Sequence, residues 1–388
     1  MTTFQDFALP EALQHKLDAL GFDKPTPVQE RAIPAAFEHR DILGSAQTGT
    51  GKTAAFSIPL LTKIMNHADV YGIIVTPTRE LALQVDEQIR AFLSAKSKIR
   101  SVVLIGGASI ERQVQALGKR PKIVVGTPGR IIDHLERKSL DLSGFNYVVL
   151  DETDRMLDMG FSAPIAEIFS HVSKERQTLL FSATLPKNIQ KISAQYLQNP
   201  VRIEMGQVNS VGDNIVQSTQ FVSKDGKFEM LVDALREHDQ SAIVFMNSKF
   251  ATEKMAKRLK SAGITAEAIH GDLRQSKRER VISNLRDNKF RVLVATDVAA
   301  RGIDVPHIHQ VINFDLPRQT EDYIHRIGRT GRNGAQGIAL NLATRDDMEK
   351  LNDIERLINP NAAKSAHNRP AGKTARKKPQ ARGRWRNK

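Results

Sequence analysis

The residues of this chain that are best suited to chemistry form a glycine-rich segment with one lysine. The segment follows an apolar run and opens a helical pattern. Glycines let backbone N–H groups turn toward phosphate oxygens, and the positive end of the next helix adds to the attraction. We predict a nucleotide phosphate site in which Lys52 reaches the β- and γ-phosphates and Thr53 holds Mg²⁺. Its residues are Ala46, Gln47, Thr48, Gly49, Thr50, Gly51, Lys52 and Thr53, with Ala46 where the general pattern has glycine.

A phosphate-binding loop needs a carboxylate for the metal at the end of another strand. The apolar run Tyr147–Leu150 leads directly into Asp151 and Glu152. We expect Asp151 to hold Mg²⁺, directly or through water, and Glu152 to polarise the attacking water. Taken alone, such an acidic pair equally suits the start of a helix. Beside the glycine-rich loop, the catalytic interpretation is favoured.

These residues need strands and helices to bring them together, and the sequence alternates between the two. Strand, helix and strand in succession predict parallel strands with helical crossovers. The strand candidates are apolar throughout, which is typical of sheets covered on both faces. The predicted strands are Asp41–Ala46, Gly72–Val75, Val102–Ile105, Ile123–Val125, Tyr147–Leu150, Thr178–Phe181, Ile215–Val222, Ala242–Phe245, Thr265–Ile269, Val292–Ala295, Val311–Phe314 and Ile338–Leu342, and predicted helices include Arg79–Ala95 and Ile131–Arg137.

Length and local composition divide the chain. At roughly 150 residues per domain, 388 residues correspond to about two or three domains. A turn-rich stretch, MGQVNSVGDN, separates two sets of strands. We therefore predict an α/β fold with one domain over residues 1–205, a linker over 206–214, a second domain over 215–360 and a tail over 361–388.

Charge is concentrated in that tail. The chain has a net charge of +14, and residues 361–388 hold ten Lys or Arg and no Asp or Glu. The tail lacks apolar periodicity, so we predict that it is disordered and binds polyanions; a merely solubilising tail is the alternative. Trp385 is set among arginines, an arrangement that can stack on a nucleic-acid base while the charges hold phosphate. The absence of Cys excludes thiolate sites, and no apolar run is long enough to span a membrane. We expect a cytoplasmic protein.

Several further motifs, in sequence order, give the chain a family resemblance. It resembles the DEAD-box ATP-dependent RNA helicases of superfamily 2, most of all the bacterial RhlE-type members. The likeness covers about residues 4 to 345 and implies two tandem RecA-like domains, each a mostly parallel sheet flanked by helices. The motifs are GFDKPTPVQ (21–29), PTRELA (77–82), GG (106–107), TPGR (127–130), DETD (151–154), SAT (182–184), VFMNS (244–248), ATD (295–297), ARGID (300–304) and HRIGRTGR (325–332).

The resemblance implies roles at the nucleotide. Gln29 would read the adenine edge, Phe22 would stack on the ring and Asp304 would accept from the ribose. Arg329 and Arg332 are three apart and would reach across a cleft to the γ-phosphate as arginine fingers. Arg326 fits the alternative of a basic surface turn, and Asp297 would order the adjacent loop.

The resemblance also implies RNA contacts and a coupling set. The RNA candidates would contact the backbone without reading sequence; they are Arg79, Gly107, Thr127, Arg130, Asn247, Gln275, Arg278 and Thr296. The coupling set would link the nucleotide to the cleft, and its members are Ser182, Thr184, Asp154 and His325.

One residue departs from the family pattern. Thr153 stands where the family name has alanine, and its hydroxyl and methyl group would pack near Ser182–Thr184. We expect ATP hydrolysis to be retained, while the effect of Thr153 on coupling is left open.

The expected activity is RNA-stimulated ATP hydrolysis, with ATP and Mg²⁺, coupled to local, non-processive opening of short RNA duplexes or remodelling of RNA–protein particles. ATP and RNA would together close the cleft between the domains. Two alternatives are a DNA-acting helicase of the same superfamily and an ATP-gated RNA clamp with weak turnover. Ribosomal particles and RNA-decay proteins are both candidate partners, and ribosome biogenesis and RNA degradation are both candidate pathways.

Overall fold

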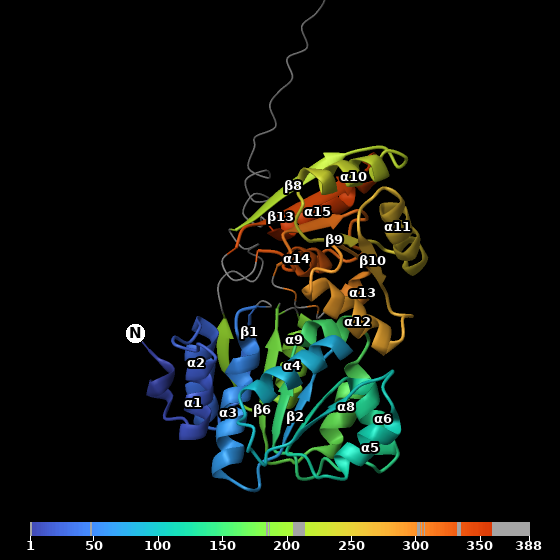
Figure 1. Ribbon diagram of the computed structural model, residues 1–388. Coiled ribbons are helices and arrows are strands. Elements are labelled where there is room, and N and C mark those ends of the chain that lie inside the picture. Colours follow the sequence, from blue (N-terminus) through green and yellow to red (C-terminus); the bar gives the residue numbers. More distant parts are fainter. Residues whose placement is uncertain are drawn as a thin grey trace, which may run out of the picture.

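The computed structural model describes residues 2–46, 49–183, 185, 187–204, 214–300, 303, 305, 307–331 and 335–358. Two α/β domains lie one above the other (Figure 1). The first contains a seven-stranded parallel sheet in the order β3-β4-β2-β5-β6-β1-β7. Its strands are β1 (Ile42–Ser45), β2 (Gly72–Val75), β3 (Ser101–Leu104), β4 (Ile123–Gly126), β5 (Tyr147–Leu150), β6 (Gln177–Ser182) and β7 (Val201–Glu204).

Helices cover both faces of this sheet because its strands carry apolar side chains on both sides. Ile42, Ile74 and Leu179 belong to one core, and their neighbours Leu43, Ile73 and Leu180 belong to the other. The first core includes residues of α1 (Glu11–Ala19), α2 (Pro27–Phe37), α3 (Lys52–Asn66), α4 (Arg79–Ala91) and the short helix η1 (Phe4–Phe7), and the second includes residues of α5 (Ile110–Leu117), α6 (Pro128–Glu136), α7 (Thr153–Asp158), α8 (Ser162–His171) and α9 (Lys187–Tyr196).

The second domain repeats this plan with a six-stranded parallel sheet in the order β10-β11-β9-β12-β13-β8. Its strands are β8 (Ile215–Phe221), β9 (Ala242–Phe245), β10 (Ala266–Ile269), β11 (Val292–Ala295), β12 (Gln310–Asn313) and β13 (Gly337–Ala343). Its helices are α10 (Lys227–Glu237), α11 (Lys249–Ser261), α12 (Gln275–Arg286), α13 (Asp297–Ala300), α14 (Glu321–Ile327), η2 (Arg345–Asp347) and α15 (Met348–Ile358).

The predicted fold class is confirmed: each domain has a parallel sheet flanked by helices. The apolar-run criterion missed β7, which pairs with β1 at the edge of its sheet. Only Ile203 of its four side chains is buried, so the strand has no continuous apolar run. The predicted helix Arg79–Ala95 is shorter, since α4 ends at Ala91.

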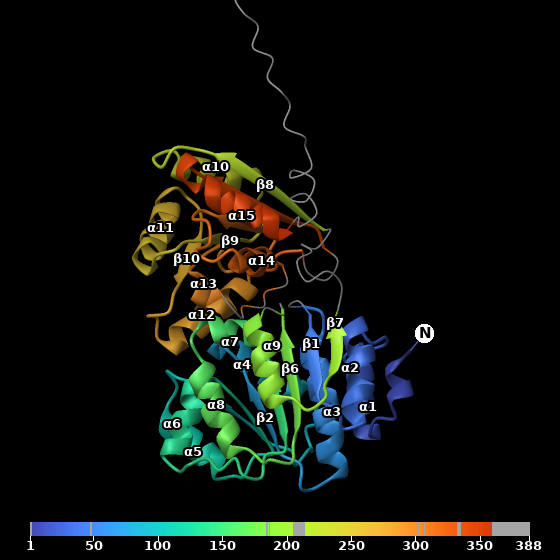
Figure 2. The ribbon, with the colours of Figure 1, turned by 180° about the vertical axis from the view of Figure 1, so that it is seen from behind.

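The arrangement places the ends of the first domain's strands beside the second domain. In Figure 2 the arrowheads of β1, β6 and β7 point toward it. Residues that follow β1, β5 and β6 therefore lie near the seam between domains. The predicted linker residues up to 213 and the tail from 359 lie outside the described residues, so those predictions stay open to test. Among the described helices, none has the length and apolar character needed to cross a membrane.

Candidate functional site

The glycine-rich loop joins β1 to α3 with the backbone turns that its sequence predicts. Gly49 and Gly51 have φ angles of 87° and 92°, which are in the left-handed region that favours glycine. Lys52 begins α3, its side chain is buried, and its Nζ has no hydrogen-bond partner in the described structure. Nζ lies 4.0 Å from Asp151 Oδ1. Ala46 and Thr53 flank the loop, and Gln47 and Thr48 lie outside the described residues.

Gln29 holds this loop from the start of α2. Its Oε1 accepts from Thr26 N at 2.8 Å, and its Nε2 donates to Gly51 O at 3.1 Å. The Thr26 hydroxyl donates to Thr50 O at 2.8 Å. Thr26 was not predicted as a site residue, although its capping box with Gln29 is a signal that sequence can show. Phe22 is half-buried and meets Phe4 edge to face, with ring centroids 5.6 Å apart.

Asp151 and Glu152 follow β5 and are both buried. Burial raises the pKa of Asp151 to about 6, although the charge of Lys52 acts in the opposite direction. Glu152 N donates to Asp151 Oδ1 at 3.0 Å. Glu152 has a φ of 51°, an unusual value for a residue with a side chain, and such backbone strain is concentrated at functional sites. The two carboxylates and Lys52 thus come together at one end of the sheet.

Thr153 and Asp154 tie the end of β5 to the end of β6. The fully buried Thr153 hydroxyl lies 3.3 Å from Leu150 O and 3.1 Å from Phe181 O, and both oxygens accept from it. Asp154 Oδ2 accepts from Ala183 N at 3.0 Å. Ser182 O accepts from Ala46 N at 3.0 Å. Ser182 and Asp154, two predicted coupling residues, therefore connect the glycine-rich loop with α7; Thr184 lies outside the described residues.

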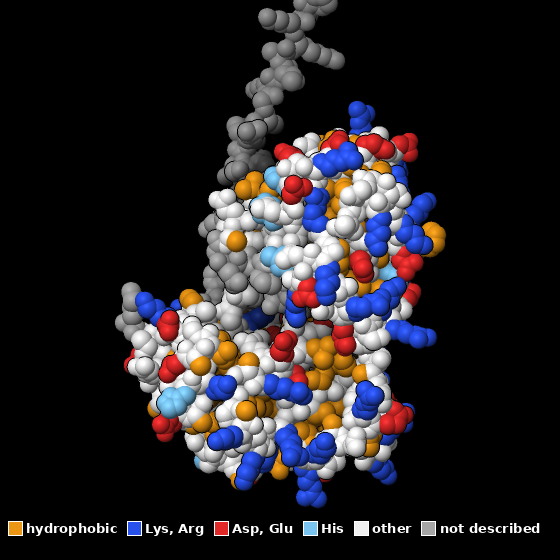
Figure 3. Space-filling view, in the orientation of Figure 1, with side chains coloured by type: hydrophobic (Ala, Val, Ile, Leu, Met, Phe, Trp, Pro, Cys, Tyr) orange, Lys and Arg blue, Asp and Glu red, His pale blue; other side chains and the backbone are white. Residues whose placement is uncertain are grey.

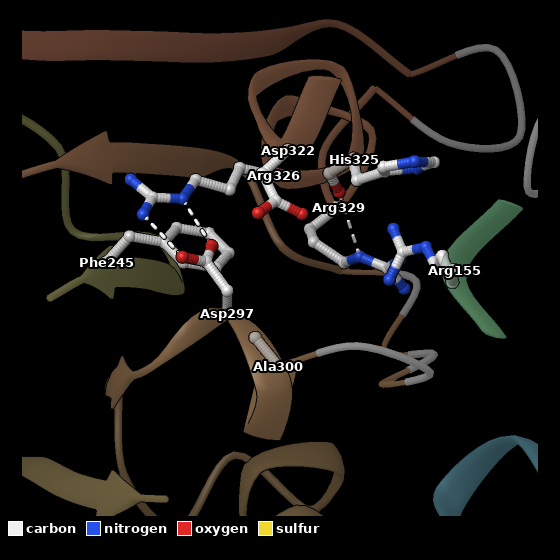
Figure 4. A pocket seen from close by; sticks show the side chains of 8 residues that line it. All are labelled: Arg155, Phe245, Asp297, Ala300, Asp322, His325, Arg326 and Arg329. Carbon is white, nitrogen blue, oxygen red and sulfur yellow. Dashed lines mark hydrogen bonds and ion pairs between the residues drawn. The ribbon is translucent and has the colours of Figure 1, made fainter. Parts of the chain in front are cut away.

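The second domain presents Arg329 and His325 to the seam. Arg329 is buried, and its Nη1 donates to Ile303 O at 3.0 Å. Figure 4 shows Arg155 of α7 pointing toward His325 and Arg329. These three residues line a cavity with room for about one water molecule, together with Phe245, Asp297, Ala300, Asp322 and Arg326. The other predicted members, Arg332 and Asp304, lie outside the described residues.

The surface-turn interpretation of Arg326 is wrong. Its side chain is 1% exposed and makes a bidentate ion pair with Asp297, at 2.5 Å and 2.8 Å. It also donates to Asn313 Oδ1 at 2.9 Å and to Asn247 Oδ1 at 3.2 Å. The sequence does hold a signal, because Tyr323, three residues earlier on α14, is buried on the same helix face.

A groove crosses the seam and is lined by residues of both domains. Arg79, Thr127 and Arg130 line it from the first domain, and Arg278 lines it from the second. The Arg79 guanidinium packs on Gly107, where a Cβ would lie 2.5 Å from Arg79 Nη1. Burial, together with the positive charge of Arg278, lowers the pKa of Arg79. In Figure 3, Lys and Arg side chains are spread over both domains, with acidic side chains beside them at the seam.

Two predicted RNA residues are engaged across the seam. Arg278 Nε lies 2.8 Å from Glu80 Oε1, and both side chains are buried. Gln275 Nε2 donates to the same oxygen at 3.5 Å. Asn247 and Thr296, which were also predicted to contact RNA, do not line the groove. Asn247 donates to Leu316 O and accepts from Arg326, and Thr296 is buried. Sequence reasoning did not single out Glu80.

Comparison with known proteins gives matches over both domains. The family model described as DEAD/DEAH box helicase matches residues 26–192, and the model of the helicase conserved C-terminal domain matches residues 226–334. The DEAD-box ATP-dependent RNA helicase CshA of Geobacillus kaustophilus is 44% identical over 358 residues, which cover 92% of this chain and 76% of that protein.

Solved structures match as well. Dbp5 of S. cerevisiae bound to RNA and ADP BeF3 matches with a TM-score of 0.84 and 31% identity, covering 92% of this chain and 94% of that one. A single-substitution variant of Dbp5, bound to a variant of Gle1 and to IP6, matches with a TM-score of 0.74 and the same 31% identity, covering 92% of each chain.

Proposed function

This chain belongs to the family of DEAD-box ATP-dependent RNA helicases, and we propose that it couples ATP hydrolysis to local, non-processive opening of short RNA duplexes or to remodelling of RNA–protein particles. It is an ATP-hydrolysing enzyme with RNA as its partner. The relatives are CshA proteins, while the RhlE-like subtype stays a prediction.

The observation that carries the proposed site is the buried ammonium of Lys52, which makes no hydrogen bond in the described structure. A buried charge without hydrogen bonds is unfavourable, so a site that keeps one is suited to an anionic ligand. Lys52 stands at the start of α3, directly after Gly51, where helix N-terminus and loop N–H groups also favour phosphate. We assign Lys52 and the loop residues to the β- and γ-phosphates of ATP.

The donor set next to Lys52 fits Mg²⁺. No group of three or more His, Cys, Asp or Glu within the described ranges could hold a metal ion alone. Mg²⁺ bound to a nucleotide needs only one or two carboxylates, because the phosphates and water complete its shell. Asp151, whose pKa is raised by burial, and the Thr53 hydroxyl would hold it. When bound, Mg²⁺ neutralises charge on the transferred phosphoryl group.

Hydrolysis would then use residues of both domains. Glu152 is buried next to Asp151 and is suited to orient the attacking water. Arg329 faces the seam, and we propose that with Arg332 it stabilises the charge that gathers on the γ-phosphate. Arginine fingers contribute about 10³–10⁵ in rate in related enzymes. Because neither domain holds the full set, hydrolysis requires the two domains to meet.

The arrangement of the domains supports closure by ATP and RNA. Dbp5 matches with a TM-score of 0.84 when RNA and ADP BeF3 are bound, but its variant bound to Gle1 and IP6 matches with only 0.74. Since the identity is 31% in both cases, we attribute the difference to domain placement and infer that this structure has the closed arrangement. Phosphate release would reopen the seam and free the RNA.

Gln29 and Phe22 are proposed to contact adenine, as the family resemblance implies. The Gln29 amide makes one hydrogen bond at its oxygen, from Thr26, and one at its nitrogen, to Gly51. A side-chain amide has a second lone pair and a second N–H, and we propose that these meet the adenine edge, with Phe22 on the ring face and Asp304 accepting from the ribose.

RNA would lie in the groove across the seam. Arg79, Arg130 and Arg278 offer guanidinium groups, which suit phosphate oxygens. Gly107, Thr127 and Gln275 are at or beside this groove. Asn247 and Thr296 are proposed to contribute after a change in side-chain or backbone contacts. Such contacts hold the backbone and read no sequence.

The test is ATP turnover by the full chain without nucleic acid, with single-stranded RNA, with duplex RNA and with DNA. We expect stimulation by RNA, and loss of turnover in Lys52→Ala and Glu152→Gln. Normal turnover in either variant would refute the site. Equal stimulation by DNA would favour a DNA helicase, and RNA binding without turnover would favour a clamp. The tail, the cytoplasmic location and roles with ribosomal particles or in RNA degradation stay predictions.

A further inference from the structure

Arg155 is a deeply buried charged residue at the seam. It lies on α7, three residues after Glu152, and its side chain is 1% exposed. None of its three guanidinium nitrogens has a hydrogen-bond partner in the described part of the chain. Its Nε lies 3.3 Å from Glu152 Oε2, and the two groups form a buried ion pair.

This pairing constrains the Glu152 carboxylate. Leaving a buried charge without its counterion is strongly unfavourable, so Glu152 cannot turn away while Arg155 stays in place. The guanidinium of Arg155 is itself enclosed, since the cavity beside it has room for about one water molecule. Glu152 also has the strained φ of 51°, a conformation that persists only where its surroundings hold it.

The position of Arg155 connects this constraint to the second domain. His325 and Arg329 line the same cavity from the other side of the seam (Figure 4). When the domains part, that cavity opens to water, and hydration weakens the attraction between Arg155 and Glu152. The ion pair is therefore strongest when the domains meet.

We propose that Arg155 is a positioning residue for ATP hydrolysis, which holds the Glu152 carboxylate in its working orientation when the two domains close. The inference rests on the proposed role of Glu152. Arg155 acts through that carboxylate and not on ATP or RNA. Its loss therefore lowers the rate of hydrolysis and leaves the binding of both ligands intact.

The first experiment measures kcat and KM for ATP at saturating RNA for full-length Arg155→Met and Arg155→Lys. We expect Arg155→Met to lower kcat by about 10–100-fold, because a small displacement of a catalytic group has effects of that size. KM for ATP and the Kd for RNA should change by less than about threefold. Arg155→Lys, which keeps the charge, should recover part of kcat. An unchanged kcat, or a KM that rises in proportion to the loss, would overturn the proposal.

The second experiment separates this role from a structural one. If Arg155 acts through Glu152, then Arg155→Met should cause no further loss of kcat in a Glu152→Gln background. A multiplicative loss in the double variant would show an independent role and refute the proposal. If Arg155→Met does not fold, two measurements still test the proposal. The first is kcat and KM for ATP of Arg155→Lys. The second is kcat of the Glu152→Gln, Arg155→Met double variant, which lacks both charges, compared with kcat of Glu152→Gln alone.

A matched control is available in Arg356→Met. Arg356 of α15 forms an exposed i,i+3 pair with Asp353, at 3.1 Å, and is not among the residues that line the cavity or the groove at the seam. This variant should retain wild-type kcat. Normal turnover in Glu152→Gln alone would refute the proposed function of Glu152, whereas failure of the Arg155 proposal leaves that function untouched.

Discussion

The ion pair between Glu80 and Arg278 gives the sharpest prediction about domain closure. Its atoms are 2.8 Å apart, and the side chains are only 4% and 7% exposed. In an open arrangement both charges would be hydrated, so breaking the pair raises the free energy of the closed state and leaves that of the open state nearly unchanged. Removing one partner of a buried pair costs about 3–5 kcal/mol. Since 1.4 kcal/mol is a factor of ten, Glu80→Ala should lower the closing equilibrium by roughly 100- to 4,000-fold.

Closure can be measured by energy transfer between dyes on the two domains. The chain has no cysteine, so Val114→Cys and Phe250→Cys would label only two exposed positions, one in each domain. With a saturating non-hydrolysable ATP analogue and RNA, the parent should populate the high-transfer state. Glu80→Ala should shift the population toward low transfer and raise the RNA concentration needed for half-maximal ATP turnover.

Two comparisons control this experiment. Exchanging the charges, with Glu80→Arg and Arg278→Glu together, should restore part of the closing equilibrium. Asp272→Ala removes an exposed pair with Lys249 within the second domain and should have no effect. If Glu80→Ala closes as readily as the parent, the pair contributes nothing to closure and the reasoning from burial is wrong.

Three further predictions concern the first domain. Thr153→Ala should lower the free energy of unfolding of the first domain by about 1–2 kcal/mol, because a hydrogen bond and a buried methyl group are lost. ATP turnover should stay within about threefold of the parent. Melting curves and turnover assays test this, and a large loss of turnover would contradict it. Gly51→Ala should weaken ATP binding by at least about tenfold, because the added Cβ would lie 2.4 Å from Gln29 Nε2. Gly144 has open space around it, so the control Gly144→Ala should not change the Kd for ATP. Burial lowers the pKa of Lys63 to about 8, so between pH 8 and 10 this group holds more protons in the unfolded chain than in the folded one. The free energy of unfolding should therefore rise by ~2 kcal/mol over that range. Lys63→Met should flatten the rise, and an identical pH dependence in both proteins would refute the reasoning.

Local pattern was enough to predict the fold class and the strands of both sheet centres. Central parallel strands are buried on both faces, so they must be apolar throughout, and this feature is visible in a short window. The edge strand β7 was not predicted, because Ile203 is its only buried residue and no apolar run marks it. The helix α4 was overextended because Phe92 and Leu93, just after its end, are buried and continue the apolar pattern.

The sequence by itself was enough to propose the chemistry at the nucleotide, because a glycine-rich turn, a lysine, two acids after a strand and a pair of arginines have few other uses in that order. Only the tertiary structure decided which charges meet. Arg326 is buried against Asp297, Arg155 is confined with Glu152 at the seam, and Arg278 pairs with Glu80. Glu80 and Arg278 are 198 positions apart in the chain. Arginine looks the same in a sequence whether it is hydrated or buried, because its burial depends on segments that the chain folds around it.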